Sequence, residues 1–107
     1  MMTSVQNVGV GWHPLIQELE TKLNELDPEF TLQQVKEKFG GLRYYASCKS
    51  EVFTEFHRLI QEAEGKSFGI CEECGDPGEP NSGRFGWMKT LCGVHQRLRE
   101  ERENSMI

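Results

Sequence analysis

Cys71-Glu72-Glu73-Cys74-Gly75 is followed by Cys92-Gly93-Val94-His95, with seventeen residues between Cys74 and Cys92. Each motif holds a pair of metal-binding side chains with two residues between them, so one tight turn or helical turn can aim both at the same ion. The long intervening segment returns the chain to complete a tetrahedral set. Gly75 suits the first turn, because glycine adopts a positive φ angle without steric cost. The spacing predicts one structural zinc ion bound by Cys71, Cys74, Cys92 and His95.

The surrounding composition supports a metal. Residues 66–83 contain few apolar side chains and many Gly, Pro, Asp, Glu and Ser residues, which cannot form a packed core unaided. A redox Cys-x-x-Cys pair usually begins a helix, whereas Asp76-Pro77-Gly78 predicts a turn. A disulfide framework is disfavoured because no secretion signal is recognisable. Iron is the minor alternative metal, and four protein ligands leave no open position for catalysis.

The segment between the two pairs indicates how the chain returns. Residues 85–91 alternate like a strand, and residues 94–99 have a helical pattern. The order of knuckle, hairpin and helix resembles a treble-clef zinc finger in its elements and in its ligand spacing. We therefore expect residues 66–107 to form a small treble-clef-like zinc-binding module with a C-terminal helix.

Residues 1–65 predict a helix, a β-hairpin and a second helix. Leu15, Leu19 and Leu23 recur at helical spacing within 15–26, where Asp27-Pro28 ends the helix. A second helix is predicted from Ser50 to a stop at Gly65. The predicted core consists of Phe39, Leu42, Tyr44, Phe53, Phe56, Leu59 and Ile60 with Leu15, Leu19 and Leu23, and Trp12 is expected to pack at the entrance of the first helix. The fold class is α+β, with both parts joined in one compact unit.

The hairpin is predicted from strand-forming residues on either side of Gly40-Gly41, a two-residue turn signal. With that turn, Phe39 pairs with Leu42 and Lys38 pairs with Arg43. One face is then apolar, and the other carries three cations and one aromatic residue. These four residues form the candidate partner-binding set: Lys36, Lys38, Arg43 and Tyr45.

The chain has 107 residues, a net charge of −5 and a pI near 5.2, which opposes non-specific attraction to nucleic acid or anionic lipid. No apolar run approaches the length of about 20 residues that a membrane span needs. The N-terminus lacks the basic and apolar regions of a secretion signal. These features predict a cytoplasmic protein without a membrane partner.

A family resemblance extends over most of the chain. It rests on four motifs, namely Gly11-Trp12 with Leu15, Val35-Lys36-Glu37-Lys38-Phe39-Gly40-Gly41-Leu42-Arg43-Tyr44-Tyr45, Cys71-x-x-Cys74-Gly75, and Thr90-Leu91-Cys92-x-x-His95. Together these resemble a family of small hypothetical proteins from bacteriophage, prophage and bacterial genomes. The resemblance implies a phage or mobile-element origin, the host cytoplasm as location, and the same zinc ligands. It implies no catalytic residue and no substrate.

An enzyme is the first functional class to weigh, because some treble-clef proteins are metal-dependent nucleases. A nuclease of that kind needs a general-base histidine and further ligands on the hairpin and helix. His13 precedes a proline and His57 lies within an amphipathic helix, where structural or surface roles are more common. Glu72 and Glu73 are expected to be solvent-exposed. Cys48 is expected to be a free, partly buried thiol. We therefore predict a protein without enzymatic activity.

Nucleic-acid binding and protein binding remain as the two non-enzymatic alternatives. The first would use the hairpin cations, Tyr45 or Trp87 for stacking, and the cations near the zinc module, namely Arg84, Lys89, Arg97, Arg99 and Arg102. The acidic net charge favours the second. We expect a zinc-braced interaction or regulatory module for a host or phage protein, with a nucleic-acid-binding zinc finger as the alternative.

Overall fold

A computed structural model describes residues 7–105, so residues 1–6, on which part of the secretion-signal prediction rests, lie outside it. Two small antiparallel sheets alternate with helices, which confirms the α+β class. The elements are a 3-10 helix η2 (Val10–Trp12), α1 (His13–Leu26), β1 (Thr31–Lys38), β2 (Gly41–Ser47), a 3-10 helix η3 (Ser50–Val52), α2 (Phe53–Ser67), β3 (Glu79–Ser82), β4 (Met88–Leu91) and α3 (Gly93–Asn104). No helix among them is long and apolar enough to cross a membrane.

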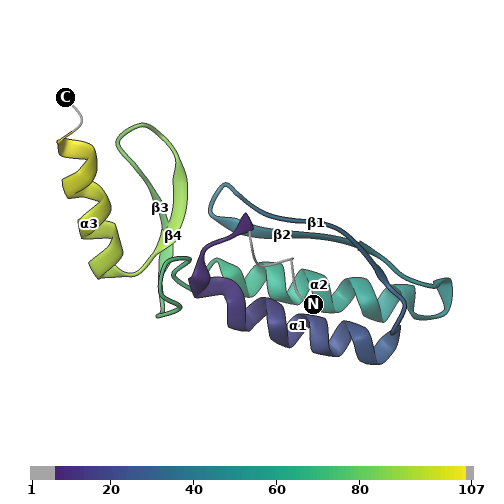
Figure 1. The fold of residues 1–107 in the computed structure, drawn as a ribbon. Helices are drawn as coiled ribbons and strands as arrows, with labels where there is room; N and C mark the ends of the chain where they lie inside the picture. Colours follow the sequence, from purple (N-terminus) through teal and green to yellow (C-terminus); the bar gives the residue numbers. More distant parts are fainter. Residues whose placement is uncertain (1–6, 106–107) are drawn as a thin grey trace.

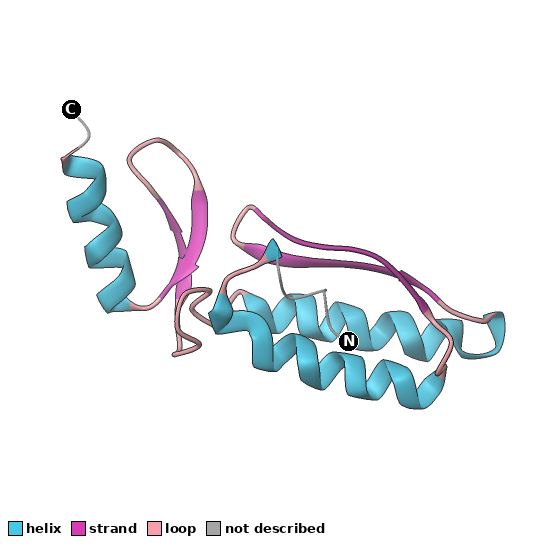
Figure 2. Ribbon diagram, in the orientation of Figure 1, coloured by secondary structure: helices cyan, strands magenta, loops and turns pink. Residues whose placement is uncertain are grey.

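The molecule is elongated, with extents of 53 × 23 × 21 Å. Helices α1 and α2 lie side by side and the β1–β2 hairpin covers them, while β3, β4 and α3 form a separate group at one end (Figure 1). Figure 2, which is coloured by secondary structure, shows that the β1–β2 hairpin and the β3–β4 hairpin belong to these two different groups. This end group and the loop that leads into it from α2 carry the predicted metal ligands.

Helix α1 begins at His13, two residues before the predicted start, and ends at Leu26 as predicted. Its buried stripe includes Leu15, Leu19 and Leu23, and the indole of Trp12 is fully buried at its entrance, as expected. Glu20 is also buried, and its Oε2 accepts a hydrogen bond of 2.8 Å from the Tyr44 hydroxyl. Burial, and then this hydrogen bond, raise the pKa of Tyr44 above its ordinary value.

Helix α2 confirms most of the predicted core, since Phe56 and Ile60 are buried and Leu59 packs against the core. The prediction was wrong for Phe53, which is 57% exposed. Phe53 is the first residue of the helix, and its ring lies 4.3 Å from that of His57. Gly65 does not stop the helix, which continues to Ser67. The Ser67 hydroxyl is buried and accepts a hydrogen bond of 2.9 Å from the amide of Leu42 in β2.

The predicted hairpin turn was wrong, because the turn residues are Phe39-Gly40 rather than Gly40-Gly41. Lys36 pairs with Arg43 and Lys38 pairs with Gly41, and Phe39 and Gly40 have φ angles of 56° and 83°. Two positive φ angles are what a type I′ hairpin turn requires. Gly41 is needed for close packing instead, because a Cβ at this position would lie 2.3 Å from Cζ of the Phe68 ring.

The register error changes the pairs but leaves the faces as predicted. Lys38 pairs with Gly41, two positions before its predicted partner Arg43. Because side chains alternate between the two faces with a period of two residues, each residue stays on its predicted face. Lys36, Lys38, Arg43 and Tyr45 therefore share the face opposite to buried Val35 and Tyr44. Like Phe53, Phe39 leaves the predicted core, and it is 67% exposed at the tip of the hairpin.

Replacing Phe39 by asparagine should stabilise the protein. A bulky L-residue in the left-handed region costs about 1–2 kcal/mol, and asparagine tolerates this region better. The exposed ring contributes little packing, so Phe39→Asn should raise the free energy of unfolding by about 1 kcal/mol. Urea denaturation of the native protein and the variant measures the change. A loss of stability would mean that the Phe39 ring is packed rather than strained.

Candidate metal centre

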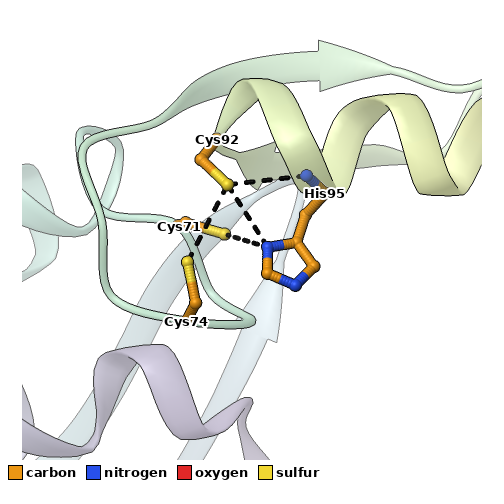
Figure 3. A group of neighbouring side chains, drawn as sticks. All are labelled: Cys71, Cys74, Cys92 and His95. Atoms are coloured by element: carbon orange, nitrogen blue, oxygen red, sulfur yellow. Dashed lines mark hydrogen bonds between the residues drawn. The ribbon is translucent and has the colours of Figure 1, made fainter.

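Three local structures bring the four predicted ligands together. Cys71 and Cys74 lie in the loop after α2, Cys92 immediately precedes α3, and His95 lies in its first turn. Their ligand atoms all lie within 4.8 Å of one another (Figure 3). Residues more than twenty positions apart in the sequence thus converge on one point, compatible with a single metal ion.

The distances fit a tetrahedral thiolate and imidazole site. Two sulfurs bound at 2.3 Å to one zinc ion would be about 3.8 Å apart. The Cys74 and Cys92 sulfurs are 3.8 Å apart, and Nδ1 of His95 lies 3.7 Å from Sγ of Cys71 and 3.2 Å from Sγ of Cys92. The histidine faces the sulfurs through Nδ1. The chemistry of this donor set, three soft sulfurs and one imidazole, is that of structural zinc sites.

The backbone of the first pair forms a tight knuckle. The Gly75 amide donates to the Cys71 carbonyl at 2.9 Å, and the Cys71 amide donates to the Asp76 carbonyl at 2.8 Å. Gly75 has a φ angle of 87°, which confirms the positive angle expected from the sequence. The knuckle therefore aims both sulfurs in one direction without strain at a side-chain-bearing residue.

Cys92 is the N-cap of α3, and its sulfur accepts a hydrogen bond from the His95 amide at 3.5 Å. This amide, and then the imidazole of His95, lower the pKa of the Cys92 thiol to about 6. A thiolate is the form that binds metal, so the helix N-terminus prepares this sulfur for coordination. Cys71 and Cys92 are buried, His95 is half-buried and Cys74 is exposed.

The expectation of solvent exposure was wrong for Glu72, which is 6% exposed, and right for Glu73. The Glu72 carboxylate accepts a hydrogen bond of 3.0 Å from the Thr90 amide, and the two backbones are also bonded. Desolvation raises the pKa of the Glu72 carboxyl. This side chain joins the knuckle to β4, while Glu73 lies 3.8 Å from the ammonium of Lys89.

The part of the chain that contains the metal ligands, residues 70–95 and here called the metal group, is attached to the helices and the first hairpin by specific hydrogen bonds. The indole Nε1 of Trp12 donates to the Ile70 carbonyl at 2.8 Å, and the Gly11 amide donates to the Glu72 carbonyl at 2.9 Å. The Thr90 hydroxyl donates to the carbonyl of Gly40, in the hairpin turn, at 2.6 Å. The metal knuckle and the tip of the first hairpin are thereby held against each other.

The four candidate partner residues lie on the first hairpin, away from the metal ligands. Lys38 and Tyr45 are exposed, whereas Lys36 and Arg43 are half-buried. Within residues 7–105, none of these three cations forms an ion pair with a carboxylate. They are therefore free to meet an external group.

Among the cations proposed for phosphate contact, Arg99 is not available. Its side chain is buried, forms an ion pair with Glu103 at 3.2 Å, and donates to the carbonyl oxygens of Asn81 and Trp87. It is an internal brace between α3 and the β3–β4 turn. Sequence reasoning missed this role because Arg99 lies on a highly charged helix.

Other residues singled out in the sequence lie outside the cluster. Cys48 is half-buried beside the core, as expected, and desolvation raises the pKa of its thiol. His13 approaches the Val8 carbonyl at 3.4 Å, and His57 approaches the Phe53 carbonyl at 3.1 Å. In the described part of the chain, neither histidine belongs to a group of potential metal ligands.

Sequence reasoning also missed a groove of about 360 Å³ between the two hairpin tips. Phe39, Phe85, Trp87 and Met88 contribute its apolar lining. The available signal was the presence of large aromatic residues, Phe85 and Trp87, in an otherwise polar loop.

No protein family, curated protein or solved structure matches this chain. The site therefore rests on its own geometry and donor chemistry.

Proposed function

We propose that this protein is a non-enzymatic, zinc-braced interaction or regulatory module of phage or mobile-element origin, which binds a host or phage protein. The origin rests on the motif resemblance. The observation that carries the interaction proposal is the outer face of the β1–β2 hairpin, where Lys36, Lys38 and Arg43 lie beside exposed Tyr45 with no internal ion pair in residues 7–105. Arginine and tyrosine are frequent at interface hot spots.

The donor set supports zinc as a structural ion. Three thiolates and one imidazole would fill the four positions of a tetrahedral ion, so no position would be left for a reacting water. The residues around the ion are engaged in holding the fold, with Glu72 bonded to Thr90 and Gly75 closing the knuckle. Zinc in this setting would fix the metal group against the hairpin tip, and the hairpin would present the contact surface.

A protein partner is favoured over nucleic acid by the distribution of charge. The net charge of −5 repels a phosphate backbone, and Arg99 is occupied internally. A nucleic-acid-binding zinc finger is the second candidate, and exposed Trp87 favours it because bases stack on such rings. A metal-dependent nuclease ranks third, since His13 and His57 both lie against backbone carbonyls.

Charge reversal on the hairpin face tests the interaction. Lys38→Glu combined with Arg43→Glu should remove a specific protein from a pull-down, because the two introduced glutamates would repel the acidic groups that the native cations attract. Bacterial lysate, affinity capture and quantitative mass spectrometry provide the measurement. The matched control is Lys22→Glu with Lys66→Glu, two exposed cations on the helices, which should leave capture unchanged.

The same pair of variants separates protein from nucleic acid. Fluorescence anisotropy with labelled DNA and RNA should detect no binding tighter than micromolar at physiological salt. Tight binding that falls steeply with salt and disappears in the hairpin double variant would overturn the preference for a protein partner.

A further inference from the structure

The tip of the β1–β2 hairpin and the turn of the β3–β4 hairpin face each other across the groove described above. Figure 1 shows the first tip pointing toward the second hairpin. The hydrogen bond from Thr90 in β4 to Gly40 in the first turn joins the two hairpins. The groove is therefore built from two segments that lie some fifty positions apart in the sequence, and the metal group fixes one of its walls.

Three aromatic side chains are displayed at this groove with large exposed fractions. Trp87 is 74% exposed, Phe39 is 67% exposed and Phe85 is 57% exposed, and Met88 is half-buried beside them. Single exposed apolar residues are ordinary, but a concave group of aromatic residues marks a binding surface. The left-handed backbone of Phe39 adds to this, because strain retained at an exposed residue is common at functional sites.

The wall that carries Trp87 is braced. The Trp87 carbonyl accepts hydrogen bonds from the Gly83 amide, at 2.9 Å, and from the guanidinium of Arg99. The amide of Arg84 donates to Glu103 at 2.9 Å. The turn is thus tied to α3 at both of its ends, which holds the backbone that carries Trp87 in position before any partner arrives and lowers the entropic cost of binding.

Positive charge lines the rim of the groove. The Lys38 ammonium lies 5.5 Å from the centre of the Phe39 ring, and the Arg84 guanidinium carbon lies 5.6 Å from the centre of the Phe85 ring. The Glu37 carboxylate is turned inward, where it accepts a hydrogen bond of 2.7 Å from the Gly40 amide. An apolar floor between two cations complements a large apolar side chain flanked by carboxylates.

We propose that the groove binds an acidic peptide segment of the partner protein, with a large apolar side chain inserted between Phe39 and Trp87. Lys38 lines the groove and also belongs to the cationic hairpin face, so the two surfaces are continuous. This inference rests on the proposed interaction function and specifies the chemistry of its partner. Single-stranded nucleic acid fits less well, because Lys38 and Arg84 lie over the Phe39 and Phe85 rings and would compete with bases for these two rings, although not for Trp87.

The test selects ligands for the zinc-loaded protein from a displayed library of random dodecapeptides. Enriched peptides should combine several acidic residues with a central aromatic or large aliphatic residue. Fluorescein-labelled copies are then titrated by anisotropy, and labelled oligothymidylate serves as the nucleic-acid probe. Trp87→Ala and Lys38→Glu should each weaken peptide binding at least tenfold.

The matched controls are Phe53→Ala, which removes another exposed aromatic side chain outside the groove, and Lys22→Glu. Both should leave the dissociation constant within twofold, and zinc content and circular dichroism check that every variant is folded. Absence of enrichment, equal loss with Phe53→Ala, or Trp87-dependent binding of oligothymidylate tighter than that of the peptides would overturn the proposal. If substitution of Arg43 or Tyr45 weakens peptide binding but substitution of Trp87 does not, the groove is refuted and the proposed interaction function stands. If the binding of acidic peptides is unchanged by substitution of Trp87, Arg43 and Tyr45, the groove and the hairpin face are both refuted as contact surfaces.

Discussion

Removal of zinc is expected to unfold residues 71–95 while the two helices and the first hairpin stay folded. Among the described residues, the buried apolar cluster of this segment contains Cys71, Leu91 and Cys92, so two of its three members are predicted ligands. Binding of zinc to small structural sites contributes about 10–16 kcal/mol, far more than burial of one leucine can replace. The other core has eleven buried members, all of which lie outside residues 71–95.

Elemental analysis of protein purified without added metal should give about one equivalent of zinc. Hydrogen exchange after chelation should then show loss of protection at Thr90 and His95, with retention at Leu19 and Ile60. The substitution Cys92→Ser should reproduce this pattern, and Cys48→Ser is the matched control that should bind zinc normally. Less than half an equivalent of zinc, iron in its place, or uniform unfolding of the whole chain would contradict the site as assigned.

The sequence predicted the ligand cluster because its signal is local. Paired ligands with two residues between them constrain the chain within one turn, and the glycine that follows reveals the turn itself. The helical stripes were readable for the same reason, since Leu15 to Leu23 and Phe56 to Ala63 repeat at the helical period. The cationic hairpin face was also predicted, because alternation survives a displacement of two residues.

The errors arose where a distant residue decides the outcome. Two consecutive glycines left two choices for the hairpin turn, and the choice depends on the Phe68 ring, which fills the space over Gly41. Glu72 resembles a surface residue in the sequence, but its carboxylate is buried because it accepts a hydrogen bond from the amide of Thr90, eighteen positions later. Phe39 resembled a core residue, but its place in the turn directs the ring outward, into the groove that sequence reasoning missed.

Substitution of Gly11 by alanine is expected to destabilise the protein strongly, although it adds one methyl group. A Cβ at this position would lie 2.0 Å from the Cys71 carbonyl oxygen, 2.6 Å from the Gly75 amide and 2.8 Å from the Cys74 amide. All three contacts are to the backbone of the metal knuckle, which cannot rotate away as a flexible side chain would. The knuckle must shift, and the hydrogen bond from Gly11 to Glu72 must break. We expect Gly11→Ala to cost about 3 kcal/mol, at the upper end of the range for overpacking.

Gly65→Ala provides the matched control, because a Cβ there meets nothing within 4 Å and the residue lies within α2. Alanine is the better helix former, so this variant should gain about 1 kcal/mol of stability from the same chemical change. Denaturation of the zinc-loaded proteins gives both values, and a competing chelator gives the zinc affinity. Gly11→Ala should also weaken zinc binding, since Cys71 and Cys74 are the residues displaced, whereas Gly65→Ala should not. Equal stability of the two variants, or unchanged zinc affinity in Gly11→Ala, would mean that the knuckle does not rest on the entrance of α1.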